Sequence, residues 1–280
     1  MRGDALRKAR CIFAIGAVPC LAAGIVAAQP VAMKPAGTWM GRKAAVALTY
    51  DDGLHVHLDK VIPVLDSAGF KGTFYLIGSR EGVTKRLDDW RSAARNGHEL
   101  GNHTLFHPCI AVAPGRDYRD WVLPEYDLNN YTVTRYVDEI RMANVFLKAL
   151  DGKDKRTLAL PCGDGVIQGT IIAPLLSSDV AGVRTGNGYN GIDDFDPLRI
   201  KAIGVDDQHT SAQLIGMVKK AQESGALLVF LFHGVGGEHR TNIALNKHND
   251  LVRYLSDNRG SIWVAPLREV AEFVRADRRH

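Results

Sequence analysis

The sequence lacks a dense cluster of lysine and arginine beyond its first ten residues, although its formal net charge is +4. Such a cluster is the usual footprint of nucleic-acid binding, so we expect no nucleic-acid partner. From residue 44 onward the sequence also lacks linkers, low-complexity blocks and repeat periods, which excludes a repeat array. Charged residues make up 24% of the chain and are well mixed, so extended disorder is not expected.

Long hydrophobic runs are absent except for one, at residues 11–28. This run follows several basic residues and closes with the small residues Val26-Ala27-Ala28, which predicts a signal peptide over residues 1–28. The alternatives are an uncleaved membrane anchor and a lipoprotein attached through Cys20, although Pro19 occupies the position where a lipoprotein usually has a small residue. We therefore expect a periplasmic or secreted protein with no membrane contact after cleavage.

Short apolar runs alternate with amphipathic stretches from residue 44 to the end, after a lead-in at residues 29–43. Alternation of this kind predicts a parallel sheet with helical crossovers, and the length favours a closed or nearly closed barrel in one domain, residues 44–280. The predicted strands are 44–50, 71–77, 99–102, 157–160, 180–184, 198–204, 226–232 and 261–265. The predicted helices are 59–68, 86–96, 129–150, 211–223, 243–256 and 267–276.

Three polar motifs follow predicted strands. Asp51 and Asp52 end the first strand, His103 follows the third, and His233 ends the apolar strand 226–232. In parallel barrels the chemistry lies at the carboxyl ends of the strands, so the three motifs predict one shared site. The alternatives are an Asp-Gly turn at Asp52 and a core histidine at His233.

Asp51 and Asp52 would repel each other unless a positive charge lies beside them, and a metal ion would supply that charge. His103 and His107 are four residues apart, the spacing that places two imidazoles on one face of a helical turn. One aspartate and two histidines leave a coordination position open, as in catalytic zinc sites. The second aspartate is then free to act as a general base.

The segments TYDDG (49–53), GHELGNHTLFHP (97–108) and LFHG (231–234) together resemble the polysaccharide deacetylase family, also called the NodB-homology domain or carbohydrate esterase family 4. The resemblance implies an α/β fold, a distorted (β/α) barrel of about seven strands. It also implies Asp51 as general base and His233 as general acid. The implied ligands of a divalent cation are Asp52, His103 and His107, with Zn²⁺ the expected metal and Co²⁺ or Ni²⁺ as alternatives.

One family motif is altered in this sequence. Ala159-Leu160-Pro161-Cys162-Gly163 stands where the family has Arg-x-Pro-aromatic-Gly, so the arginine that orients the base is missing. Arg184 on the next predicted strand is a candidate replacement. The backbone N–H of Cys162 can still stabilise an oxyanion, because this role needs no side chain. The residue that orients His233 is not clearly matched; Asp206 is the first candidate, and Asp207, Asp194 and Asp196 are alternatives.

The resemblance implies removal of acetyl groups from a carbohydrate, with an N-acetylglucosamine polymer as the first substrate. The alternatives are O-deacetylation of an acetylxylan-type polymer and a non-catalytic carbohydrate-binding relative. Residues 113–131 form a long segment after the histidine pair and could supply a substrate wall or simply pack beneath the loop. Its aromatic residues are Tyr118, Trp121, Tyr126 and Tyr131. His55 and His57 are expected at a solvated helix start, with a place at the mouth of the site as the alternative. The other histidines expected at the surface are His209, His239, His248 and His280.

Two cysteines, Cys109 and Cys162, would remain after signal cleavage. Both lie in segments expected at the same end of the barrel, and an exported protein meets an oxidising environment. We therefore predict a disulfide bond between them. Two separate thiols, or Cys162 as a thiol beside the metal, are the alternatives.

Overall fold

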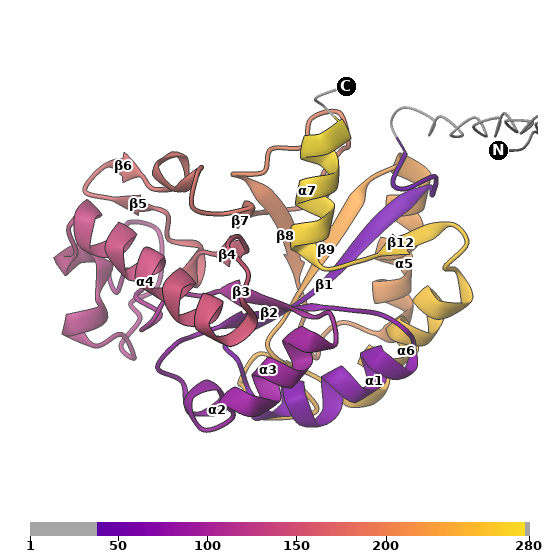
Figure 1. Ribbon diagram of the computed structural model, residues 1–280, viewed down its shortest axis with the longest axis horizontal. Helices are drawn as coiled ribbons and strands as arrows, with labels where there is room; N and C mark the ends of the chain where they lie inside the picture. Colours follow the sequence, from indigo (N-terminus) through magenta and orange to yellow (C-terminus); the bar gives the residue numbers. More distant parts are fainter. Residues whose placement is uncertain (1–37, 278–280) are drawn as a thin grey trace, which may run out of the picture. The chain divides into compact units, whose positions relative to one another are not determined.

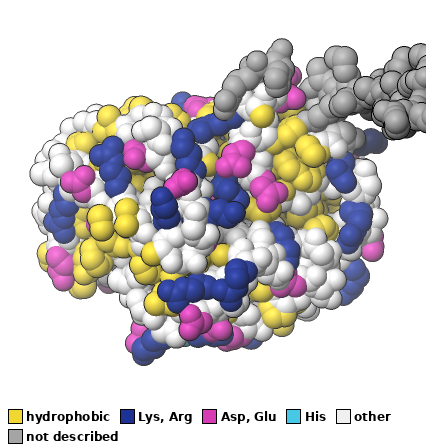
Figure 2. Space-filling view, in the orientation of Figure 1, with side chains coloured by type: hydrophobic (Ala, Val, Ile, Leu, Met, Phe, Trp, Pro, Cys, Tyr) yellow, Lys and Arg dark blue, Asp and Glu magenta, His cyan; other side chains and the backbone are white. Residues whose placement is uncertain are grey.

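The computed structural model describes residues 38–277. The predicted signal peptide and its cleavage site lie outside these residues, as does most of the lead-in. Within residues 38–277 no helix is both long and apolar enough to cross a membrane. On the face shown in Figure 2, lysine and arginine side chains are interspersed with aspartate and glutamate.

Seven parallel strands of the described chain close into a barrel, which confirms the predicted fold (Figure 1). Their order is β1-β2-β3-β4-β7-β8-β9, and β9 pairs back to β1 from Ala45 to Tyr50. The ring consists of β1 (Ala44–Asp51), β2 (Thr73–Leu76), β3 (Glu99–Asn102), β4 (Thr157–Ala159), β7 (Gly182–Asn187), β8 (Ile200–Gly204) and β9 (Leu227–Phe232). An additional strand, β12 (Ile262–Val264), pairs with the start of β1, before β1 turns to pair with β2.

Most helices cover the outside of the ring, whereas α7 packs against β1 and joins the cluster of its interior face. They are α1 (Ile62–Ser67), α2 (Glu81–Thr84), α3 (Leu87–Arg95), α4 (Val133–Asp151), α5 (Ser211–Ser224), α6 (Leu245–Asp257) and α7 (Leu267–Asp277). The two longest helices end within one residue of their predicted ends, and a glycine in the left-handed conformation follows each: Gly152 after α4 has φ 70° and Gly225 after α5 has φ 66°. Thr210 and Gln213 form a reciprocal capping box at the start of α5.

Short irregular elements account for most of the differences from the prediction. The helix expected over 59–68 is a π-helical turn, η1 (His57–Val61), followed by α1. The small strand pairs β5 (Val166–Ile167) with β6 (Thr170–Ile171), and β10 (Gly234–Val235) with β11 (Asn242–Ile243), were not predicted. Trp39 is fully buried, so packing of the domain already begins within the lead-in.

Successive side chains along a strand point alternately toward the surrounding helices and toward the barrel interior. Leu48 and Tyr50 of β1 pack in the cluster that includes helix residues such as Trp90, whereas Ala45 and Ala47 pack in a second cluster. That second cluster lies inside the ring and is closed by apolar side chains of α7. Because strand side chains alternate between faces, the last odd-numbered residue of β1, Asp51, belongs to the interior face.

Candidate metal and catalytic site

Asp51 and Asp52 stand at the carboxyl end of β1, and both are only 3% exposed. The chain reverses immediately after Asp51, because Asp52 has φ 81° and Gly53 has φ 64°. A Cβ at Gly53 would lie 2.5 Å from Val83 Cγ2, so the tight turn requires glycine there. The turn places the Asp52 carboxylate at the same end of the barrel as the Asp51 carboxylate.

His103 and His107 follow β3 in an irregular loop, so the predicted helical turn is wrong. Thr104 and His107 have positive φ angles of 65° and 56°. Side chains hold this conformation: Asn102 Oδ1 accepts from the Thr104 N–H at 2.7 Å, and Thr104 Oγ1 accepts from the His107 N–H at 2.9 Å. Glu139 on α4 accepts from the Phe106 N–H at 3.0 Å. The loop is therefore built by local capping of its own N–H groups.

Asp52, His103 and His107 converge, with ligand atoms all within 4.8 Å of one another. Asp52 Oδ1 lies 3.6 Å from His103 Nε2 and 3.8 Å from His107 Nε2. Two ligands of a tetrahedral zinc ion with bonds of about 2.1 Å lie roughly 3.4 Å apart, so the spacing fits one cation. His103 Nδ1 donates to the Ala159 carbonyl at 2.8 Å, which turns Nε2 toward Asp52.

Asp52 Oδ1 is buried and has no hydrogen-bond partner among the described residues. A buried carboxylate oxygen without a donor is costly, and a cation between the two imidazoles would satisfy it. Burial raises the pKa of Asp52, but the neighbouring His103 and His107 outweigh this effect and lower it to about 2. Burial lowers the pKa of His107 to about 3, so its imidazole is neutral and free to ligate.

Arg184 holds the other aspartate. Its Nη2 donates to Asp51 Oδ2 at 2.5 Å, and both side chains are almost fully buried. Burial raises the pKa of Asp51, but Arg184, ahead of His103 and His233, more than compensates, and the pKa falls below its usual value. In the sheet, Arg184 is the direct register partner of Ala159. The guanidinium thus reaches the interior from the strand beside the position where the family motif has its arginine.

His233 follows β9 and lines a cavity of about 490 Å³ together with Asp51, Asp52 and both histidines of the loop. It does not belong to the set of side chains that converge on the cation position. Burial lowers the pKa of His233, and its Nδ1 is buried with no hydrogen-bond partner within residues 38–277. His57 Nε2 donates to the His233 carbonyl at 2.8 Å and so fixes the backbone of His233. The imidazole ring of His233 stacks on that of His239.

Asp206 does not contact His233, contrary to the expectation that it orients this residue. Its Oδ1 accepts from His209 Nδ1 at 3.0 Å within the turn that precedes α5. Asp207 is also engaged elsewhere, where it accepts from Asn242 and from the Ala244 N–H. The Asp206 side chain is therefore used to build a turn rather than a catalytic pair.

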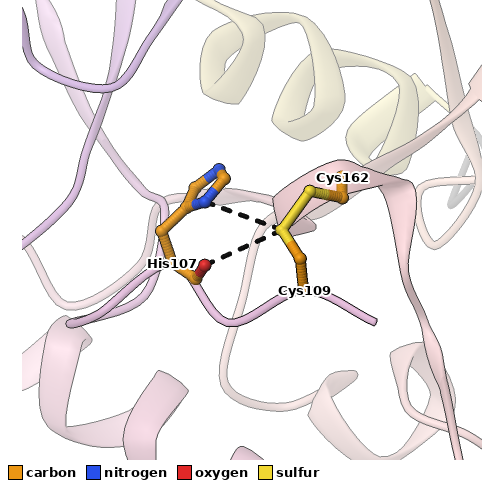
Figure 3. Close-up of side chains that lie close together, drawn as sticks. All are labelled: His107, Cys109 and Cys162. Carbon is orange, nitrogen blue, oxygen red and sulfur yellow. Dashed lines mark hydrogen bonds between the residues drawn. A yellow bond between two sulfur atoms is a disulfide. The ribbon is translucent and has the colours of Figure 1, made fainter. Parts of the chain in front are cut away.

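The disulfide bond predicted between Cys109 and Cys162 is present, with the Cα atoms 5.8 Å apart. It joins the histidine loop to the Pro161–Gly163 turn, in which Cys162 has φ 57° and borders the cavity. Cys109 Sγ also lies 3.7 Å from His107 Nδ1 and from the His107 carbonyl oxygen (Figure 3). The bridge therefore supports a metal-ligand candidate and the oxyanion candidate together, and the alternative of a free thiol at Cys162 is wrong.

Three histidines that we expected at the surface are part of the interior or of the site. His57 and His248 are fully buried, and His248 Nε2 lies 2.8 Å from the Tyr50 hydroxyl. The His239 ring is stacked on His233 with centroids 4.6 Å apart, and His239 Nε2 lies 3.7 Å from Asp52 Oδ2. A lone histidine in a glycine-rich loop gives no sequence signal for this placement.

Comparison with known proteins agrees with this geometry. Residues 40–173 match the sequence profile of the family described as Polysaccharide deacetylase. The family resemblance predicted from the motifs is confirmed. The matched segment contains both aspartates, the histidine loop and the altered Ala159–Gly163 motif, while Arg184 and His233 lie beyond it.

Curated relatives match this chain over short segments. A peptidoglycan-N-acetylglucosamine deacetylase from Bacillus cereus is 35% identical over 89 residues, which are 31% of this chain and 32% of that protein. A chitooligosaccharide deacetylase from Sinorhizobium fredii is 35% identical over 80 residues, which are 28% of this chain and 36% of that protein. The chain therefore spans about a third of the length of these relatives.

Solved structures share the barrel. A candidate polysaccharide deacetylase from Mycobacterium smegmatis superimposes with a TM-score of 0.60 at 16% identity, covering 88% of this chain and 95% of that one. The peptidoglycan deacetylase PdaC from Bacillus subtilis gives a TM-score of 0.53 at 17% identity, covering 84% and 93%. At these identities the likeness shows the fold alone.

Proposed function

We propose that this protein is an exported, metal-dependent hydrolase that removes acetyl groups from N-acetylglucosamine units of a polysaccharide. The observation that carries the proposal is the arrangement in the 490 Å³ cavity: three converging ligand candidates beside an arginine-held aspartate and a half-buried histidine, His233. The family match supports the substrate class, as do the two curated deacetylases, each of which is 35% identical to this chain over a short segment.

Each side chain has a distinct task in this proposal. Asp52, His103 and His107 would hold a divalent cation, most simply Zn²⁺, which when bound would polarise the acetyl carbonyl and make water a better nucleophile. Asp51 accepts the proton of the attacking water, and Arg184 keeps its carboxylate oriented. The Cys162 N–H donates to the developing oxyanion, and His233 in its protonated form gives its proton to the departing amine. The proton that Asp51 takes from water replaces the one that His233 loses, so each turnover leaves both side chains as they began.

The test is acetate release from N-acetylglucosamine oligosaccharides by purified protein, before and after treatment with a chelator. Activity should disappear with the chelator and return with added Zn²⁺, Co²⁺ or Ni²⁺. Acetylxylan in a parallel assay distinguishes ester from amide preference. Binding of the oligosaccharides without any acetate release, at full metal occupancy, would instead make the protein a carbohydrate-binding relative. Export is tested separately, by locating the protein in cell fractions and sequencing its mature N-terminus.

A further inference from the structure

The hydrogen bonds around His233 hold its backbone rather than its ring. Its carbonyl accepts from His57 Nε2 at 2.8 Å, whereas its Nδ1 is buried with no hydrogen-bond partner in the part of the chain that the structure describes. Asp206 and Asp207 bind elsewhere and do not orient the ring. An imidazole that delivers a proton to a leaving group has to be held in one orientation. A contact other than a hydrogen bond to Nδ1 therefore has to orient this ring.

The His239 imidazole makes such a contact. It is stacked on the His233 imidazole, with ring centroids 4.6 Å apart and ring planes only 12° from parallel. Both histidines line the cavity of about 490 Å³ that also contains the two aspartates. A nearly parallel ring at this separation covers one face of the His233 imidazole and limits how far its plane can turn.

The His239 ring is itself held in place. Its Nδ1 lies 3.0 Å from the Thr241 nitrogen and 3.1 Å from the Thr241 carbonyl oxygen, and its Nε2 lies 3.7 Å from Asp52 Oδ2. His239 does not belong to the group whose ligand atoms converge with those of Asp52 on the cation position. Its place in the site is therefore beside His233 rather than among the ligand candidates.

The loop between β10 and β11 is anchored to the beginning of η1. The two carboxylate oxygens of Glu238 accept from the His55 N–H at 3.0 Å and from the Val56 N–H at 2.7 Å. The Lys60 ammonium donates to the Gly236 carbonyl. These contacts tie the loop to the segment that directly follows the two aspartates, so the loop is fixed against the site from outside.

The backbone of this loop has a strained conformation. Glu238, the residue before His239, has φ 69°, and Gly237 has φ 129°. A Cβ at Gly234 would lie 2.4 Å from the Gly237 carbonyl oxygen and 3.2 Å from His239 Cβ, so the loop folds back closely over the start of β10. A left-handed conformation at a glutamate persists only where the surrounding contacts impose it, and strain of this kind is concentrated at functional sites.

We propose that His239 is the positioning residue of His233: its stacked ring holds the His233 imidazole in the orientation from which it protonates the leaving group. This inference rests on the proposed deacetylase function, in which His233 is the general acid. Such positioning matters only for a leaving group that needs a proton, as the amine of an N-acetylated sugar does. The phenolate of 4-nitrophenyl acetate leaves without one, so the two substrates should respond differently.

The first experiment measures kcat and KM of the zinc-loaded protein for N-acetylglucosamine trisaccharide and for 4-nitrophenyl acetate. His239→Ala should lower kcat for the trisaccharide about tenfold, the size of a good aromatic contact, with KM and the aryl ester reaction nearly unchanged. His239→Phe retains a flat ring and should restore most of kcat. His209→Ala removes a histidine of similar exposure, 26% against 22%, that does not line the cavity, and should change neither reaction. Equal losses on both substrates, or no recovery in His239→Phe, would overturn the proposal.

The second experiment uses neither substrate nor metal. Diethyl pyrocarbonate modifies accessible imidazoles, and mass spectrometry of peptides gives the rate at each histidine. In metal-free protein, His239→Ala should raise the rate at His233 several-fold, because one face of the ring becomes open. Glu238→Ala, which releases the loop but keeps His239, should also raise it, whereas His239→Phe and His209→Ala should not. An unchanged rate in His239→Ala would refute the positioning. A raised rate, in a protein whose natural form releases no acetate from any sugar, would preserve the positioning of His233 and refute the proposed function.

Discussion

Replacing Arg184 with alanine removes the guanidinium that holds Asp51 by a 2.5 Å hydrogen bond in a buried environment. Removing one partner of a buried ion pair typically costs about 3–5 kcal/mol, because the remaining charge stays uncompensated. The pKa of Asp51 should rise, since burial already pushes it upward and Arg184 is the first of the groups that lower it. A carboxylate that is displaced or protonated is a poor base. We expect kcat/KM to fall about 100-fold, the usual cost of a misplacement of roughly 1 Å.

The assay is acetate release by the metal-loaded variant, with unfolding in denaturant measured in parallel. The decisive comparison is the double variant Ala159→Arg/Arg184→Ala, which moves the arginine to the register partner of its present position. At least tenfold recovery of kcat/KM is expected, because both positions face the same interior. Arg141→Ala, which removes an exposed ion pair with Asp179, should change nothing and serves as the control. If Arg184→Ala keeps kcat/KM within twofold of the natural protein, Asp51 does not depend on this arginine and the reasoning is wrong.

Three further predictions concern metal, disulfide and pH. Asp51→Asn should abolish acetate release but retain bound zinc, whereas His103→Ala should lose both; equal metal loss in the two variants contradicts the assigned roles. Cys109→Ser should lower the free energy of unfolding by roughly 4 kcal/mol in the chain-entropy model, because the bridge closes a segment with a sequence separation of 53. Two titratable thiols in the unreduced protein without residues 1–28, which contain Cys11 and Cys20, would exclude the bridge. Burial lowers the pKa of both His57 and His248 to about 4, so the unfolded chain takes up protons first as the pH falls. The contribution of these two histidines to the free energy of unfolding should therefore be fully present above about pH 6.5. It should decrease by about 2 kcal/mol for each histidine between pH 7 and pH 5. A melting temperature unchanged over this range, or an equal loss in His248→Gln, would contradict it.

The barrel could be predicted because its determinants are local. Each strand is a short apolar run, and the helix-ending glycines Gly152 and Gly225 adopt the left-handed conformation that the sequence signals imply. The two-residue alternation of side chains along a strand also fixes which residues at its end face inward. Asp51 lies on the same face of β1 as Ala45 and Ala47, which pack in the interior cluster. The predicted strands were therefore sufficient to place the polar residues that follow them at one end of the barrel.

His57, His239 and His248 could not be placed in this way, because their surroundings come from distant segments. His57 is buried against His233, 176 positions away, and His248 against Tyr50, 198 positions away. Neither contact leaves a periodic trace in the sequence. A histidine near a glycine-rich turn has the same local pattern whether it is exposed or stacked on a catalytic candidate.

The histidine loop shows how a spacing rule can bring the right residues together for the wrong local reason. The separation of His103 and His107 suggested adjacent positions on a helix, yet Thr104 and His107 have positive φ, which an α-helix does not allow. The two imidazoles meet because side chains of Asn102 and Thr104 cap the loop's N–H groups and the cystine contacts His107. The geometry of the metal-ligand candidates thus depends on neighbours that no ligand motif includes. Disrupting those neighbours should therefore weaken metal binding even with all three ligand candidates intact, and measuring bound zinc in Thr104→Val against the natural protein tests this dependence.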